Sequence, residues 1–236
     1  MRINVNSIQA MAECPAYYQF LKRGIKKPVK KQISIVEKVV KACYLQASRT
    51  TYKSNWHRIV THVDKETFLD INVHNKEEMI QARSTSEHAL VWLRQWYNTI
   101  YLPEEGTGYI DVPVRGQVGH YTIEATIPVI KLIDKPIILY IDDIATNVTQ
   151  MYNNLSLRIL MWLITETLQS DIVGAQHLTM GPIGGFQNVY IDIARKDSSR
   201  ILKIVRQIAE MIEKNYSFPS VTEKCSTCPF VKGCII

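Results

Sequence analysis

Three cysteines lie within ten residues in the segment CSTCPFVKGC, at Cys225, Cys228 and Cys234. Thiolates at such short spacing are typical ligands of zinc, iron–sulfur clusters or copper. A tetrahedral zinc ion and a 4Fe–4S cluster each take four protein ligands. The segment therefore needs a fourth ligand from a distant part of the chain, and this requirement restricts the possible folds more strongly than any other pattern in the sequence.

Two further cysteines, Cys14 and Cys43, are available for this role. Cys43 lies on the apolar face of an expected helix, which is typical of a buried free thiol. Cys14 precedes Pro15 at an expected irregularity of a helix, where a side chain can point outward. Cys14 is therefore the predicted fourth ligand, and a histidine such as His177 is the alternative. Five cysteines also fit metal ligands plus one bystander better than a set of disulfides.

The composition is that of a soluble protein of 236 residues with a net charge of +6, which favours an acidic partner such as nucleic acid. No apolar run is long enough to cross a membrane. The N-terminal segment lacks the apolar core of a signal peptide, so we expect a cytoplasmic (intracellular) protein without membrane association. A basic segment is the candidate nucleic-acid contact, with a solvated loop as the alternative; it contains Lys22, Arg23, Lys26, Lys27, Lys30 and Lys31.

Apolar periodicity predicts an α/β fold in which helices flank a mixed central sheet. We expect helices over 6–24, with a break near Pro15, and over 33–48, 76–101, 153–169 and 197–215. The first is expected to be capped by Asn6 or Ser7 and the last by a residue of 197–199. Strands are expected over 109–119, 120–130 and 135–146, and two more over 171–194 around the turn GPIGG. We expect one domain over 1–236, divided into 1–31 (helix and basic loop), 32–105 (helical), 106–196 (sheet core) and 197–236 (helix and cysteine segment).

The N-terminal stretch SIQAMAECPAYYQFL, taken with CSTCPFVKGC, resembles the RecB/AddB-like iron–sulfur nucleases, including the CRISPR-associated RecB-like exonucleases. The resemblance implies a PD-(D/E)XK nuclease-like core whose N- and C-terminal segments are joined by a 4Fe–4S cluster, with zinc as the alternative. Such a tie would be structural. The positions that match are Ser7, Cys14, Pro15, Tyr18, Cys225, Cys228 and Cys234.

The same resemblance implies metal-assisted phosphodiester hydrolysis by two acidic residues and a lysine. When TIEATIPVI and IILYIDDIAT are placed on that pattern, Pro128 replaces the first acid, Asp143 occupies the second acidic position and Ala145 replaces the lysine. Glu124 is a weaker candidate for a metal ligand. The catalytic set is therefore expected to be incomplete.

We accordingly expect a catalytically inactive RecB/AddB-like iron–sulfur protein that binds DNA or another nucleic acid, or that serves as a subunit of a nucleic-acid-processing assembly. One alternative is an active Mg²⁺- or Mn²⁺-dependent DNA exonuclease that uses Asp143, Glu124 and a displaced lysine, Lys131 or Lys135. A further alternative is a scaffold that contacts only a protein partner.

Overall fold

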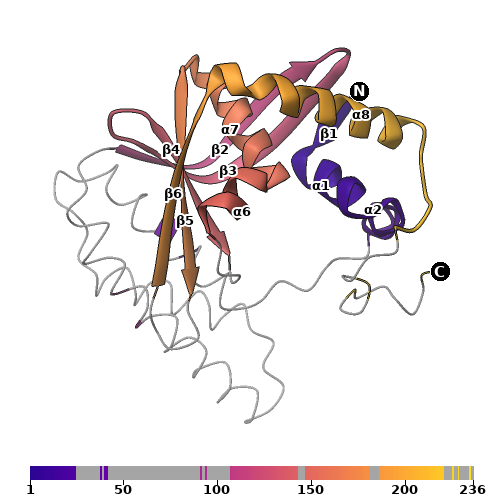
Figure 1. Cartoon of the computed structure of the whole chain (residues 1–236), viewed down its shortest axis with the longest axis horizontal. Coiled ribbons are helices and arrows are strands. Elements are labelled where there is room, and N and C mark those ends of the chain that lie inside the picture. Colours follow the sequence, from indigo (N-terminus) through magenta and orange to yellow (C-terminus); the bar gives the residue numbers. More distant parts are fainter. Residues whose placement is uncertain are drawn as a thin grey trace, which may run out of the picture.

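The computed structural model describes residues 1–24, 107–142, 147–180 and 186–220, together with residues 38, 40, 41, 91, 94, 225, 228 and 234. These residues form a mixed sheet with helices packed against it (Figure 1). The α/β fold with a mixed, helix-flanked central sheet is confirmed. None of the helices in the described part of the chain is long and apolar enough to cross a membrane.

Six strands make up this sheet, with β1, β3, β4, β5 and β6 in spatial order and β2 paired to β3. The β1–β3 and β4–β5 pairs are parallel, whereas β2–β3, β3–β4 and β5–β6 are antiparallel. Their bounds are β1 Arg2–Asn4, β2 Thr107–Val118, β3 Tyr121–Leu132, β4 Pro136–Asp142, β5 Ile172–Met180 and β6 Phe186–Ala194.

Strand β3 carries two different neighbours along one edge. Its residues Thr122–Glu124 pair with β1, and its residues Ile130–Leu132 pair with β4. The stretch between them contains Pro128, whose ring nitrogen has no hydrogen to donate to a neighbouring strand. The sheet therefore opens between β1 and β4, and we call this opening the β3 fork.

The first helical segment is divided in two, as predicted. Helix α1 covers Val5–Glu13 and α2 covers Pro15–Lys22, with Cys14 in an extended conformation (φ −167°, ψ 120°) between them. Proline at the first position of α2 is well tolerated, because that position has no intrahelical donor to lose. Gly24 follows α2 at φ 83°, the left-handed conformation that commonly ends helices.

The predicted N-cap of the first helix was wrong. The cap is Asn4, whose Oδ1 accepts a hydrogen bond from the backbone N–H of Asn6 at 2.9 Å. Asn4 has the extended backbone that a cap requires because it is the last residue of β1. Strand β1 itself was not predicted, since three residues carry no readable periodicity.

Helices α6 (Val148–Asn153) and α7 (Leu155–Leu168) connect β4 to β5. Only the second was predicted; the two are separated by Asn154, whose side chain accepts from the backbone N–H of Leu157 and so starts α7. A short 3₁₀ helix, η2 (Arg195–Ser198), precedes α8 (Ser199–Glu213). Ser198 occupies the cap position of α8, as expected, but its side chain makes no capping hydrogen bond.

Helix α7 packs against the sheet and contributes buried side chains to the core. A Cβ added at Gly116 of β2 would lie 2.5 Å from Trp162 Cη2, so only glycine lets this ring approach the strand. Trp162 and Leu163 are almost completely buried. Burial of side chains of this size contributes roughly 1.5–3 kcal/mol each.

Of the remaining predictions of secondary structure, some are confirmed and others fall on residues outside the described part. The three strands over 109–146 and the hairpin turn between β3 and β4 are confirmed through Asp142. The two strands expected over 171–194 are confirmed as the antiparallel pair β5 and β6, and residues 181–185 between them lie outside the described part. Of the helices expected over 33–48 and 76–101, only Lys38, Val40, Lys41, Val91 and Arg94 are described, and all five are helical.

Candidate functional site

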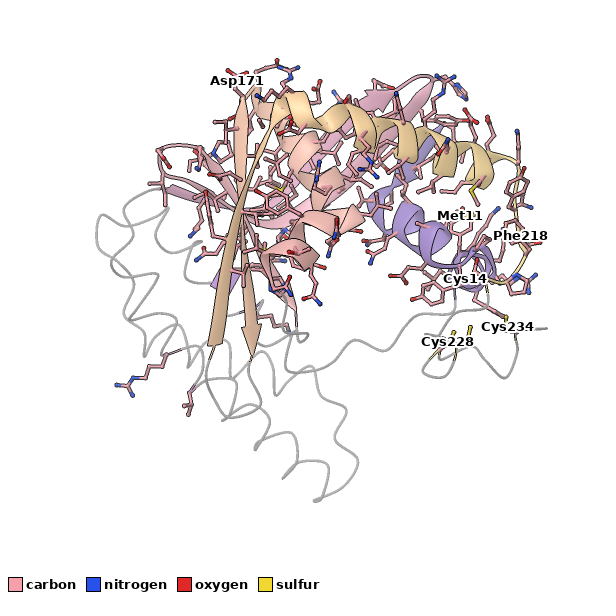
Figure 2. All side chains as sticks on the ribbon, viewed as in Figure 1. Met11, Cys14, Asp171, Phe218, Cys228 and Cys234 are labelled. Carbon is pink, nitrogen blue, oxygen red and sulfur yellow. The ribbon has the colours of Figure 1, made fainter. Side chains whose placement is uncertain are left out.

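Four thiols from the two ends of the chain lie close together. We call Cys14, Cys225, Cys228 and Cys234 the thiol corner; all four are free and partly exposed. Burial raises the pKa of Cys234, and the nearby thiolates of Cys14, Cys228 and Cys225 raise it further. Figure 2 shows Cys228 and Cys234 beside the α1–α2 junction that carries Cys14. Cys14 therefore lies near the three C-terminal cysteines, and its role as a fourth ligand stays a prediction.

Hydrogen bonds through Ser220 connect the two halves of the corner. The backbone N–H of Ser220 donates to Cys14 Sγ at 3.3 Å, and Cys225 Sγ donates to the Ser220 carbonyl at 3.7 Å. A turn brings the backbone N–H of Cys228 to 3.2 Å from the Cys225 carbonyl oxygen. Hydrogen bonds to sulfur are one means by which proteins stabilise thiolate ligands and their clusters.

One tyrosine of α2, Tyr17, lies near the corner, and the next, Tyr18, belongs to the hydrophobic core. Burial raises the pKa of Tyr17, with smaller contributions from Glu13 and Cys228, so the Tyr17 ring lies near that thiol. Burial also raises the pKa of Tyr18, which is 8% exposed.

The tail after α8 is attached directly to α2 (Figure 1). Gln19 Nε2 donates to the Tyr216 carbonyl at 3.0 Å, and Lys22 Nζ donates to Asn215 Oδ1 at 3.0 Å. These bonds direct the chain from α8 toward Cys14. Lys22, one of the predicted nucleic-acid contacts, thus has a structural partner, while Arg23 is exposed. Lys26, Lys27, Lys30 and Lys31 lie outside the described residues.

The four thiols of the corner are suitable metal ligands by type, but they are not arranged around a common metal position. Within the described residues, no three His, Cys, Asp or Glu side chains are already arranged to hold a metal ion. Four thiols nevertheless match both zinc and a 4Fe–4S cluster, and a bound cation would relieve the repulsion that raises the pKa of Cys234. Binding would have to draw the four sulfurs closer together.

The structure places His177, the alternative fourth ligand, in β5. Its side chain is 3% exposed and stacks on Tyr140 of β4, with ring centroids 5.3 Å apart. Burial lowers the pKa of His177 to about 4. His177 is therefore a neutral residue of the sheet interior.

A cavity of about 460 Å³ lies at the β3 fork. Its walls come from the start of α1, from β3 and β4, and from the start of α7. No charged side chain is among its described lining residues, which are Asn4, Val5, Asn6, Gln9, Ala125, Thr126, Pro128, Ile138, Leu139, Tyr140, Ser156 and Leu160.

The predicted catalytic positions are only partly gathered here. Pro128 lines the cavity. Glu124 does not; it is paired in the sheet between Asn4 of β1 and Arg115 of β2. Asp143 and Ala145 lie outside the described residues.

The two candidate lysines have other partners. Lys131 is 3% exposed, and its Nζ donates to Gln176 Oε1. Lys135 Nζ lies 2.5 Å from Asp192 Oδ2 in an ion pair, and this hydrogen bond raises the pKa of Lys135 to about 12. Neither lysine is among the residues that line the cavity.

The polar rim of the cavity was not predicted from the sequence. Asn4, Asn6 and Thr126 are ordinary surface residues in any local pattern. They come from three elements, β1, α1 and β3, and β3 is far from the other two in the chain. The capping preference of asparagine was the one available signal; it pointed to Asn6, which lies on the rim, although the cap itself is Asn4.

Comparison with known proteins supports the fold alone. No protein-family model and no curated protein matches the sequence. Among solved structures, this chain is similar to the "putative exonuclease" of Eubacterium rectale, with a TM-score of 0.64 and 10% identity over 100% of this chain and 88% of that one. A second match, to the protein SSO0001, has a TM-score of 0.37 and 13% identity over 93% of each chain, which is too low to carry an argument. The chain therefore has a mixed α/β fold similar to that of a nuclease-type structure.

Proposed function

We propose that this chain binds nucleic acid without cutting it, on a nuclease-like fold whose terminal segments are tied together by a metal centre at the thiol corner. The observation that carries this proposal is the chemistry of the fork cavity. Its described lining is apolar or uncharged, and Pro128 lies where the resemblance implies an acidic metal ligand. Metal-assisted hydrolysis needs anionic ligands that this lining does not supply.

Nucleic-acid binding is supported by charge and by fold. The chain carries a net charge of +6. On α8, Arg200 and Lys203 are exposed, and Arg23 is exposed after α2. Cations at such positions attract phosphates and release counterions on binding. The similar structure from Eubacterium rectale is described as an exonuclease, which makes nucleic acid the natural class of partner.

The metal centre would be a 4Fe–4S cluster or a zinc ion held by Cys14, Cys225, Cys228 and Cys234. When bound, it supplies a cross-link between α1–α2 and the segment after α8. The chain positions the ligands through the break at Cys14, the Ser220 hydrogen bonds and the docking of the α8 tail on α2.

A second candidate is a Mg²⁺- or Mn²⁺-dependent exonuclease. The observation that favours it is Lys131, a buried lysine on β3 whose Nζ is held by Gln176. A lysine in such a setting is unusual for a purely structural residue. It would act with Asp143.

A third candidate, a subunit that contacts only protein, draws on two exposed aromatic residues on the tail beside the thiol corner. Tyr216 is 40% exposed and Phe218 is 54% exposed.

Labelled single- and double-stranded DNA, incubated with the purified protein and Mg²⁺ or Mn²⁺, separates these candidates. We expect binding that weakens with salt, and intact DNA. A Lys26/Lys27/Lys30/Lys31→Ala variant should bind more weakly, whereas a Lys196→Ala/Lys214→Ala control should lose less. Cleavage that disappears in Asp143→Ala would establish the exonuclease instead, and absence of binding at low salt would leave the protein-only subunit.

A further inference from the structure

The fork cavity has two chemically different parts. Its fully buried lining residues are apolar: Val5, Ile138 and Leu139 are each at most 2% exposed. Its exposed lining residues are uncharged and polar: Asn4, Asn6 and Thr126. The cavity thus has an apolar floor and a hydrogen-bonding rim, and its volume of about 460 Å³ lies within the usual range of small-molecule sites.

Several polar groups of the lining are already used by the fold. Ser156 Oγ donates to Gln9 Oε1 at 2.6 Å, and Gln9 Nε2 donates to Glu13 Oε1 at 3.2 Å. Asn4 Oδ1 accepts from the Asn6 backbone N–H. These bonds fix the shape of the cavity, but they leave little capacity for a ligand at Ser156 and Gln9.

The rim retains free hydrogen-bonding capacity. Within the described part of the chain, the side-chain amide of Asn6 and the hydroxyl of Thr126 make no hydrogen bond, and the NH₂ group of Asn4 is also unbonded. An asparagine amide offers a donor and an acceptor side by side, which is the arrangement that pairs with the edge of a nucleobase. Tyr140, itself stacked on His177, adds an aromatic wall.

We propose that the fork cavity binds a single nucleobase, with the planar ring against the apolar floor and its polar edge at Asn6 and Thr126. A phosphate fits this lining less well. No cation is among the described lining residues, and the Asn6 N–H at the start of α1 is taken by the Asn4 cap. The inference rests on the proposed function, because a bound nucleic acid would supply the base.

Isothermal titration calorimetry tests this site: nucleosides are titrated into the protein as purified, without added divalent ions. The probes are adenosine, guanosine, cytidine and uridine, with ribose and inorganic phosphate as separate arms. We expect at least one nucleoside to bind with a Kd below about 1 mM, in the range of weak specific ligands, while ribose and phosphate do not bind. Saturable binding of phosphate alone, or no nucleoside binding, would overturn the inference.

Substitutions locate the binding. Asn6→Leu/Thr126→Val removes the free rim groups and should weaken nucleoside binding at least tenfold. The matched control is Thr122→Val, on the same strand but outside the cavity lining, and it should bind as the parent does. If the double variant fails to unfold cooperatively, Thr126→Val alone repeats the test, since valine preserves the shape and the strand preference. Unchanged affinity in the rim variants would place the nucleoside elsewhere and reject the site.

DNA binding measured on the same preparations keeps the two proposals distinct. DNA binding without any nucleoside binding rejects the base site and leaves the proposed function intact. Nucleoside binding without DNA binding supports the base site and rejects the proposed function.

Discussion

The thiol corner and the fork cavity both gather residues that are far apart in the sequence, but they differ in what carries the site. In the corner, four copies of one rare and chemically distinctive side chain converge. In the cavity, common side chains acquire meaning only from the opening between β1 and β4. A site defined by residue type can be recognised without a fold, whereas a site defined by shape cannot.

The two regions also differ in what they do for the chain. The corner lies between its first helices and its last described residues, so its expected contribution is to stability. The cavity lies at the sheet, and its walls are already well packed: Ile138 and Leu139 are almost fully buried. Substitutions in the corner should therefore lower the stability of the protein more than its affinity for a nucleoside. Substitutions at the cavity rim should lower the affinity for a nucleoside more than the stability.

The largest effect should follow loss of the corner. Replacing Cys14 by serine should abolish binding of the proposed metal and lower the free energy of unfolding by roughly 2–5 kcal/mol, because the proposed tie closes a loop of almost the whole chain. Metal content, visible absorbance and urea unfolding measure these effects; absorbance also separates a 4Fe–4S cluster from zinc.

Cys43→Ser is the control for this prediction and should retain both metal and stability. If Cys14→Ser kept its metal while Cys225→Ser, Cys228→Ser and Cys234→Ser lost theirs, the fourth ligand would lie elsewhere. The rim variant Asn6→Leu/Thr126→Val should keep its metal, which is the reciprocal control for the comparison of the two regions.

A smaller effect should come from His177, which stacks on Tyr140 of the cavity lining, as the pH falls. Burial lowers the pKa of His177 from 6.5 to about 4, so between these values the unfolded chain binds a proton that the folded chain does not. Stability should therefore fall by roughly 3 kcal/mol as the pH drops from about 6.5 to 4. Urea unfolding across this range measures the slope.

In His177→Gln and in His177→Phe, the free energy of unfolding should no longer show this decrease between pH 6.5 and 4, because neither side chain titrates in this range. This holds whatever stability each variant loses at pH 7. His120→Gln, which changes an imidazole that is 67% exposed, should retain it. A parent protein equally stable at pH 6.5 and pH 4.5 would contradict the prediction. Such a result would indicate that His177 is protonated in the folded state.

Much of the sheet could be predicted because its signals are local. Alternating apolar residues indicate β2 and β3, and the short turn after Leu132 indicates the β3–β4 hairpin. Strand β1 could not be predicted, because its three residues form a strand only by pairing with Thr122–Glu124, more than a hundred residues away. The same pairing holds Asn4 extended and decides which polar residue caps α1.

The candidate sites were predictable to different degrees for the same physical reason. The position of Cys14 at a helix break near the other thiols could be predicted, because the Pro15 break and the unusual side chain are both visible in sequence. The free rim groups of Asn6 and Thr126 could not, since their position depends on how far β3 and β4 diverge at Pro128. Lys131 and Lys135 were named by residue type alone, as candidates in the alternative of an active exonuclease. Their partners, Gln176 and Asp192, could not be predicted because they belong to strands from another part of the chain.

The smallest expected effect concerns Lys135, at the end of the β3–β4 hairpin farthest from the fork. Its ion pair with Asp192 raises its pKa from 10.5 to about 12, so the stabilisation is present below pH 10.5 and is lost as the pH rises toward 12. The side chains are 25% and 41% exposed, which limits the contribution to about 0.5 kcal/mol. Urea unfolding of the parent and of Lys135→Met should differ by this amount at pH 7 and pH 9 in low salt, and by less at pH 11.5 or in 1 M salt. Loss of nucleoside binding in Lys135→Met, with stability unchanged, would instead return this lysine to the functional site and bring the hairpin end into the comparison.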